Sequence, residues 1–254
     1  MGTRLGALTR DRPKAMLEFE GRTLIARQVA AYRRCGVHRV AVVGGYRDDV
    51  LRVDERVVRY RNPDYDRTNM VESLMCARPE LSGPVVLSYG DVLFEDRVLR
   101  AVIEATCAIG VTVDTDWQAY WRARYGDVTT DTETLQLGAD GRISSIGQPN
   151  PRPDQIDARY VGLLRFDAHG IETLLAVYDR ARAAHTDGPW QTSSRFEQGY
   201  LTDLLQETID QGFPVEPIAV QRGWLEFDTT DDYRLATEWS AAGRLAEFCA
   251  LTPA

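Results

Sequence analysis

Two basic residues near the start of the chain have the types that phosphate chemistry requires. Lys14 is the single lysine among the 30 lysine and arginine residues, and Arg4 lies ten positions before it, across a small-residue turn and Pro13. A lysine ammonium is a compact point charge and an arginine guanidinium is a planar fork, so the two are poorly interchangeable beside one phosphorus atom. We expect Arg4 and Lys14 to clamp a polyphosphate, although a surface lysine would fit the composition equally well.

Two carboxylates could complete such a site. Asp91 follows an apolar run and Gly90, and Asp228 ends the segment that begins at Trp224. Transfer chemistry on a polyphosphate requires the reacting anions held in line and their charge neutralised. Two carboxylates with phosphate oxygens satisfy Mg²⁺, so we expect loss of either aspartate to cripple turnover. Each aspartate could instead cap a helix, and Glu226 either ligates the metal or pairs with an arginine.

In the first half of the chain, the elements that must position these residues are expected to alternate between helix and strand, as in α/β folds. Apolar positions recur at helical spacing in some segments and run continuously in others, which predicts alternating helices and buried strands. A carboxylate just past the end of a buried strand is where open α/β sheets place ligand chemistry. We expect helices at 23–34, 69–77 and 98–105, and strands at 39–43, 57–60, 84–88 and 111–113. In the second helix Met70, Val71, Leu74 and Met75 should point inward.

The second half of the chain continues the pattern. Residues 132–137 and 142–146 flank a turn signal at 139–141 and predict a hairpin. The further expected elements are strands at 160–166 and 215–220, helices at 170–184 and 196–211, and a helix from about residue 230. The stretch 148–154 holds three prolines and is a loop. Because no long linker divides the sequence, we expect one domain over residues 1–254.

Bulk properties exclude several classes of partner. A net charge of -8 and a pI near 5.0 argue against nucleic acid and anionic membranes as binding partners, since both bind proteins through basic patches. The four cysteines are scattered, which suits reduced thiols better than disulfides or a zinc site. No apolar run reaches membrane-spanning length and no secretion signal opens the sequence. We expect a soluble, cytoplasmic protein; a homodimer is possible on this composition.

Four separated segments resemble the nucleotidyltransferases of the sugar-nucleotide pyrophosphorylase superfamily. Within that superfamily they look most like the group of phosphocholine and phosphonate cytidylyltransferases. The segments are Gly2-Thr3-Arg4-Leu5 with Pro13-Lys14, then Asn62-Pro63-Asp64-Tyr65 through Asn69 and Ser73, then Tyr89-Gly90-Asp91, and last Trp224 to Asp228. Their order and wide spacing make the match more specific than a lone glycine-rich loop.

The resemblance implies a fold, a reaction and roles for the residues. The fold is a three-layer α/β sandwich with a mostly parallel, Rossmann-like mixed sheet, the nucleotide-diphospho-sugar transferase fold. The reaction transfers CMP from CTP to a small phosphorylated alcohol such as phosphocholine, or to a phosphonate, and releases pyrophosphate. Asn69 could equally be a helix cap. The implied nucleotide-binding residues are Gly2, Thr3, Arg4, Asn62, Asn69, Ser73 and Gly90; Lys14 and Arg4 are catalytic, and Asp91, Asp228 and Glu226 hold Mg²⁺.

The acceptor site is the most open part of the interpretation. Trp117 and Tyr120, with Trp121 and Tyr125 nearby, either box a quaternary ammonium beside Asp116 or fill a core. Arg122, Arg124 and Arg165 either grip the phosphate or phosphonate of the acceptor or are ordinary solvated charges.

The chain departs from the family pattern at its start. Family members begin with a strand and a small-residue turn before the Thr-Arg-Leu, and here Met1 stands where that turn should end. Either the true start lies upstream, or the sheet has a gap that exposes an unpaired central strand edge. Three other functions remain open: a sugar-1-phosphate nucleotidylyltransferase, a glycosyltransferase using Asp114-Thr115-Asp116, and a regulatory subunit that binds nucleotide without releasing pyrophosphate.

Overall fold

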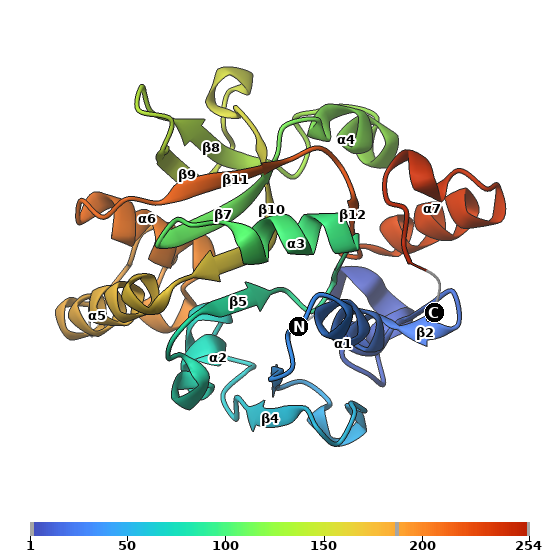
Figure 1. The fold of residues 1–254 in the computed structure, drawn as a ribbon, viewed down its shortest axis with the longest axis horizontal. Helices are drawn as coiled ribbons and strands as arrows, with labels where there is room; N and C mark the ends of the chain where they lie inside the picture. The colour runs from blue at the N-terminus through green and yellow to red at the C-terminus, as the bar shows by residue number, and fades with distance from the viewer. Residues whose placement is uncertain (1–2, 186–187, 253–254) are drawn as a thin grey trace.

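The computed structural model describes residues 3–185 and 188–252, and in it helices and strands alternate along the chain (Figure 1). The helices are α1 (Leu24–Arg34), α2 (Met70–Cys76), α3 (Asp96–Glu104), α4 (Trp117–Tyr125), α5 (Ala168–Ala184), α6 (Leu201–Asp210) and α7 (Thr230–Ala241). The strands are β1 (Glu18–Phe19), β2 (Arg22–Thr23), β3 (Ala41–Gly44), β4 (Val58–Arg61), β5 (Val85–Ser88), β6 (Val92–Phe94), β7 (Ile109–Asp114), β8 (Glu133–Leu137), β9 (Ile143–Pro149), β10 (Arg159–Phe166), β11 (Glu216–Val220) and β12 (Trp224–Glu226).

A mixed sheet with the order β11-β7-β10-β5 forms the centre of the molecule. β11 runs parallel to β7, whereas β10 runs antiparallel to both of its neighbours. All six residues of β7 are buried, as expected for a strand covered on both faces. Two shorter antiparallel pairs accompany the sheet, β8 with β9 and β12 with β6. The fold class expected from the sequence is therefore confirmed, with β10 as the antiparallel member.

The side chains of β10 show that the sheet is the middle of three layers. Val161 and Leu163 pack into a cluster with α3, while Leu164 and Phe166 pack into a second cluster with α5. A register shift lies between Tyr160 and Leu164, where Gly162 adopts a φ of +77°. A Cβ at that glycine would come within 2.8 Å of the Tyr89 ring, so the close approach of β10 to the end of β5 requires glycine.

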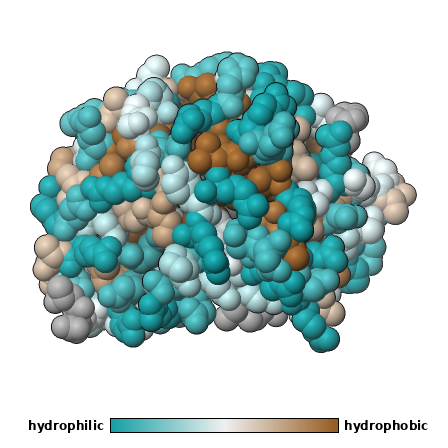
Figure 2. Space-filling view, turned by 90° about the horizontal axis from the view of Figure 1, so that it is seen from below, coloured by the Kyte–Doolittle hydropathy of each residue, from teal (hydrophilic) through white to brown (hydrophobic). Residues whose placement is uncertain are grey.

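β3 and β5 each have one hydrogen-bonded neighbour. β3 pairs in parallel with β4 alone, and β5 pairs with β10 alone. No strand of the described residues joins β3 to β5, and every residue in both strands is half-buried. On the face seen from below in Figure 1, hydrophobic side chains reach the surface between hydrophilic ones (Figure 2). Among the described residues, β3 and β4 therefore form a two-stranded sheet separate from the central one, in which β5 is an edge strand.

Most expected elements are present within a residue or two, and three expectations differ. Met70 was expected to point inward but is 36% exposed, because it is the first residue of α2. The helix expected over 196–211 is divided into a 3₁₀ turn (Phe196–Gln198) and α6. Gly199 lies between them with φ −57° and ψ 132°, an extended conformation through which a helix cannot continue. The aromatic segment at Trp117 forms α4, which the sequence did not predict as a helix.

Candidate active site

Lys14 lies between the carboxylates of Asp91 and Asp228. Its Nζ donates to Asp91 Oδ2 at 2.9 Å and to Asp228 Oδ1. Pro13 is extended, with φ −70° and ψ 156°, and the turn Lys14–Met16 begins directly after it. This turn packs against Gly90: a Cβ built at that glycine would lie 3.4 Å from the Ala15 side chain, at van der Waals contact. The turn thus presents the lysine to residues that follow β5.

Strand pairing explains why Asp91 and Asp228 meet although 137 positions separate them in the sequence. β12 and β6 pair in antiparallel register, with Glu226 opposite Val92. The pairing continues past the strand end, since the Phe227 amide donates to the Asp91 carbonyl at 3.0 Å. Both aspartates therefore leave the same end of this ribbon.

Arg4 lies on the other side of Asp228. Its Nη2 donates to Asp228 Oδ2, and its Nη1 donates to Asp131 Oδ2 at 3.0 Å. The Tyr125 hydroxyl donates to the same Asp131 oxygen at 3.1 Å. The Arg4 side chain is 53% exposed, so it can exchange a carboxylate for an arriving anion. The structure thus brings together Arg4, Lys14, Asp91 and Asp228, the cluster that we call the phosphate clamp.

Charge keeps the phosphate clamp ionised. Burial disfavours the charged form of Lys14, yet Asp91 and Asp228 raise the pKa of its ammonium group above the usual value. Burial likewise acts against the Asp228 carboxylate, but Lys14 and then Arg4 hold its pKa below its usual value. At neutral pH Lys14, Arg4 and Asp228 therefore carry their charges at close range.

These shifts predict a pH dependence of stability. A carboxyl group whose pKa is lower in the folded state stabilises the fold above its unfolded pKa, about 3.9 for aspartate, and this stabilisation is lost as pH falls through the folded pKa. We therefore expect the free energy of unfolding of Asp228→Asn to depend less on pH below about 4 than that of the wild type. Urea denaturation in EDTA, with the exposed Asp66→Asn as control, measures this. Equal pH slopes for the wild type and Asp228→Asn would contradict it.

A buried ion-pair network fixes the backbone at Asp228. Asp232 Oδ2 accepts the amides of Asp228 and Thr229 at 3.0 and 2.8 Å, and Asp232 Oδ1 accepts Arg124 Nε at 2.8 Å. Arg124 Nη1 also donates to Glu226 Oε2 at 2.7 Å. The Arg124 side chain is 1% exposed. The helix cap of α7 and the position of the phosphate clamp therefore depend on one arginine.

Glu226 faces this network and not the clamp. Burial raises the pKa of its carboxyl group, and Arg124 opposes that shift. The sequence left two roles open for Glu226, metal ligation and pairing with an arginine, and the structure shows the pairing with Arg124. Within residues 3–185 and 188–252, no group of three or more His, Cys, Asp or Glu side chains is arranged to hold a metal ion.

The residues expected to face the nucleoside have partners within the protein. The buried Asn62 amide donates to Thr68 Oγ1 and Ser73 Oγ, both at 2.9 Å, and Ser73 Oγ donates to the Asn69 carbonyl at 3.1 Å. Asn69 Nδ2 donates to the Gln198 carbonyl at 3.2 Å and caps nothing with its side chain. These contacts shape the turn before α2, and the nucleoside role of the three residues stays a prediction. Gly2 lies outside the described residues, and Thr3 begins the 3₁₀ segment Thr3–Thr9.

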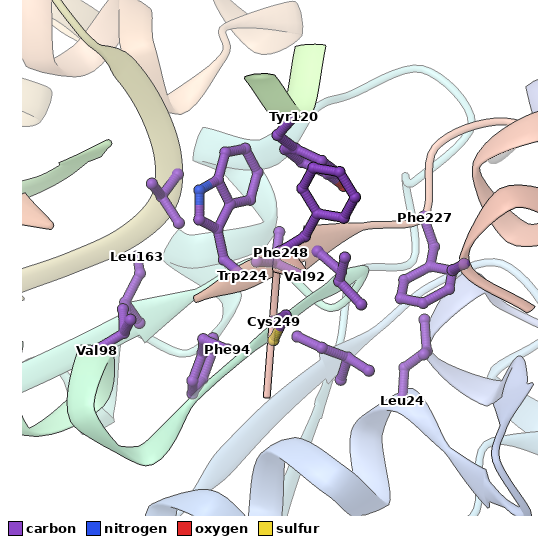
Figure 3. Packing of buried hydrophobic residues seen from close by; sticks show 14 of the residues in the cluster. Leu24, Val92, Phe94, Val98, Tyr120, Leu163, Trp224, Phe227, Phe248 and Cys249 are labelled. Atoms are coloured by element: carbon purple, nitrogen blue, oxygen red, sulfur yellow. The ribbon is translucent and has the colours of Figure 1, made fainter. Parts of the chain in front are cut away.

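The residues expected to bind the acceptor are scattered. Trp117 and Tyr120 are each 3% exposed, and Tyr120 packs beside Trp224 and Phe248 in the core (Figure 3). Asp116 pairs with Arg222, at 2.7 Å from its Nε. Of the two readings for the aromatic cluster, the structure shows core packing for Trp117 and Tyr120.

Two arginines proposed for the acceptor also lie apart from the phosphate clamp. Arg122 is exposed and donates to Gln118 on its own helix at 3.2 Å. Arg165 donates to the Cys107 carbonyl. It is paired with Gly110 and Val86, toward the end of β5 opposite to Asp91.

The Asp-x-Asp segment has a structural role. Asp114 is fully buried, and its carboxylate accepts hydrogen bonds from the Asp116 amide, the Arg222 amide and the Trp224 indole at 2.8 to 3.0 Å. A carboxylate occupied by three N–H groups is not available to a metal-bound nucleotide diphosphate. This arrangement removes the observation on which the glycosyltransferase reading rested.

Asp131 and Asp232 were not predicted from the sequence, and Arg124 was grouped with the acceptor arginines although it binds Glu226 and Asp232. One signal was present for Asp232, since Thr229-x-x-Asp232 is a capping-box pattern and both of its hydrogen bonds form. Asp131 lies in a loop, where no periodicity or motif marks it.

The fold and the phosphate clamp together define an α/β nucleotidyltransferase. The described fold matches the solved CTP:phosphocholine cytidylyltransferase of Streptococcus pneumoniae with a TM-score of 0.67 at 19% identity, covering 93% of each chain. It also matches the inositol-1-phosphate CTP transferase of T. maritima with a TM-score of 0.66 at 22% identity, covering 98% of this chain and 94% of that one. The chain belongs to the family of the MobA-like NTP transferase domain, whose family model matches residues 1–148.

Curated relatives extend the similarity beyond residue 148. The chain is 29% identical over 248 residues to the CTP:phosphoglutamine cytidylyltransferase of Campylobacter jejuni, covering 93% of this chain and 96% of the relative. It is 22% identical over 241 residues to the choline-phosphate cytidylyltransferase of Streptococcus pneumoniae, covering 94% and 93%. No helix in the described residues is long and apolar enough to cross a membrane.

Proposed function

We propose that this protein is a cytidylyltransferase that joins CMP from CTP to a small phosphorylated or phosphonate acceptor and releases pyrophosphate. The observation that carries the proposal is the phosphate clamp, in which Lys14 and Arg4 converge on two aspartates from distant segments. The printed activities of the relatives, on phosphoglutamine and on choline phosphate, support CTP as the donor and a small phosphorylated acceptor.

The reaction assigns a part to each cation. An oxygen of the acceptor phosphate or phosphonate attacks the α-phosphorus of CTP, the bond to the β-phosphate oxygen breaks, and pyrophosphate leaves with the electron pair. Lys14 leaves its carboxylate partners to neutralise charge on the α-phosphate, and the exposed Arg4 binds the departing phosphates. Catalysis of this kind consists mainly of positioning and charge neutralisation.

Mg²⁺ is part of the proposal. Asp91 and Asp228 already converge on one cation, the Lys14 ammonium, and carboxylate oxygens are ligands that Mg²⁺ prefers. With phosphate oxygens and water these two aspartates would hold the ion, which when bound supplies further neutralisation of phosphate charge. We do not propose Glu226 as a Mg²⁺ ligand, because its carboxylate forms an ion pair with Arg124.

The proposal places the protein in the cytoplasm and in solution. All four cysteines are free, including the buried Cys249, which suits a reducing compartment. The partners we propose are the nucleoside triphosphate and the acceptor, with neither nucleic acid nor membrane among them.

Pyrophosphate release tests the proposal. We expect release with Mg²⁺ and CTP in the presence of a small phosphorylated or phosphonate acceptor, with UTP, GTP and ATP slower, and loss of release in EDTA. Hexose 1-phosphates serve as the acceptor control, since release with them alone would favour a sugar-1-phosphate nucleotidylyltransferase. Nucleotide binding without release from any acceptor would instead indicate a regulatory subunit and overturn the proposal.

A further inference from the structure

Arg159, the first residue of β10, has unused hydrogen-bonding capacity next to the phosphate clamp. Its Nη2 donates to the Asp131 carbonyl at 3.0 Å, and its guanidinium lies 4.1 Å from the centroid of the Trp121 ring. Its Nε and Nη1 are buried without a hydrogen-bond partner, and within the described ranges it forms no ion pair. A buried N–H without a partner is destabilising, and such groups are rare in folded proteins.

Arg124 provides the contrast. It lies over the same Trp121 ring, at 4.6 Å, but its Nε and Nη1 are both bound to carboxylates. The two arginines therefore share an aromatic neighbour and differ in how much of the guanidinium is unpaired, since Nη2 alone lacks a partner in Arg124 and both Nε and Nη1 lack one in Arg159. Arg124 is held by two carboxylates, whereas Arg159 has no carboxylate partner among the described residues.

Glu133, the first residue of β8, has the opposite charge and is also without a partner. In residues 3–185 and 188–252 its half-buried carboxylate accepts no hydrogen bond. Burial raises the pKa of its carboxyl group, Arg159 opposes that shift, and Glu226, Asp131 and Asp203 add to it. Glu133 comes two positions after Asp131, whose carbonyl accepts from Arg159 Nη2 at 3.0 Å, so Glu133 and Arg159 come from adjoining segments, yet they form no ion pair with each other.

Asp131 ties this pair to the phosphate clamp. Its carboxylate accepts from Arg4, and its carbonyl accepts from Arg159. It does so with a φ of 51°, in the left-handed region that aspartate tolerates better than most residues. A ligand whose phosphate sits at the clamp therefore has Arg159 and Glu133 within the reach of a short chain.

We propose that Arg159 and Glu133 bind the end of the acceptor remote from its phosphorus atom, and that this end carries both a carboxylate and an ammonium group. The inference rests on the proposed function and names the substrate class for that site. Arg159 pairs with the carboxylate through its free N–H groups, and Glu133 accepts from the ammonium. A ligand with both charges satisfies both groups at once, whereas a choline-like cation leaves Arg159 unpaired.

Calorimetric titration of the full chain with three compounds tests the pair without turnover. The probes are O-phospho-L-serine, which has both groups, phosphoethanolamine, which lacks the carboxylate, and 3-phosphonopropionate, which lacks the ammonium. We expect phosphoserine to bind tightest. Arg159→Met should weaken phosphoserine binding roughly 10- to 100-fold and leave phosphoethanolamine within about threefold. Glu133→Gln should weaken both compounds and leave 3-phosphonopropionate within about threefold.

Matched controls separate recognition from folding. Arg180→Met removes another guanidinium stacked over an aromatic ring, that of Phe213, and Glu216→Gln neutralises a half-buried carboxyl on β11. Both should bind all three compounds like the wild type, and Arg159→Lys, which keeps the charge, should bind phosphoserine better than Arg159→Met. Thermal unfolding confirms that each variant is folded.

The outcomes distinguish the inference from the function on which it rests. If Arg159→Met and Glu133→Gln bind all three compounds like the wild type, or if phosphoserine binds no better than phosphoethanolamine, the inference is wrong. If the binding pattern is as expected but CTP with phosphoserine releases no pyrophosphate, the recognition pair stands and the proposed reaction falls. If CTP and phosphoserine release pyrophosphate but both variants bind all three compounds like the wild type, the proposed reaction stands and the recognition pair falls.

Discussion

Lys14→Ala is expected to lower kcat/KM for pyrophosphate release by roughly 100- to 1000-fold, the range seen when one preorganised charge-stabilising group is removed. The physical reason is that Lys14 is the most buried cation of the phosphate clamp, with its side chain 22% exposed. No other lysine exists in the chain to replace it. Initial rates of pyrophosphate release with CTP and the acceptor provide the measurement.

Two comparisons make the Lys14 result specific. Lys14→Arg keeps the charge but replaces a point charge with a wide fork, so we expect it to recover only a small part of the activity. Arg142→Ala removes an exposed arginine in the β8–β9 turn and should leave the rate unchanged. A Lys14→Ala protein with activity within about threefold of the wild type, when folded, would show that Lys14 takes no part in the chemistry.

Arg124→Met is expected to cause a large loss of stability, about 3–5 kcal/mol in the free energy of unfolding. The substitution leaves Asp232, whose side chain is 3% exposed, and Glu226 as buried carboxylates without their cation. Losing the partner of a buried charge costs more than the pair itself contributes. Urea denaturation followed by fluorescence measures the change.

The same helix supplies the control for Arg124. Arg122→Met, two positions earlier and exposed, should change stability by no more than about 0.5 kcal/mol. Adding Asp232→Asn to Arg124→Met should restore part of the loss, because it removes one of the stranded charges. Additive effects of the two substitutions would mean that the ion pair does not couple them.

Lys14 and Asp91 of the phosphate clamp carry local signals in the sequence, whereas Arg4 was inferred from its place before Lys14 and Asp228 from the family resemblance. Lys14 is unique in type, and Asp91 follows a continuous apolar strand, so chemistry and position could both be inferred. The helix at 23–34 was predicted within one residue because its apolar residues recur at helical spacing, and in the structure Thr23 caps it by accepting from the Ala26 amide at 3.3 Å. The prediction that these segments converge is confirmed by the β12–β6 pairing.

The parts that the sequence could not predict depend on tertiary contacts. Trp117 and Tyr120 look alike whether they face a ligand or a core, and only the packing beside Trp224 decides between the two. Arg124 and Arg159 are two arginines among many, and their difference comes from which carboxylates the fold brings to each. The helix expected over 196–211 is broken by the extended backbone of Gly199, which helical periodicity does not report.

The placement of the phosphate clamp along the chain has a consequence for synthesis in the cell. Arg4 and Lys14 leave the ribosome 224 and 214 positions before Asp228, and the cap at Asp232 follows Asp228. A ligand stabilises only those states that can bind it. Nucleotide should therefore protect the released protein from proteolysis and give no protection to nascent chains arrested before Asp228, so that the cellular nucleotide pool acts on this fold only after Asp228 has been synthesised.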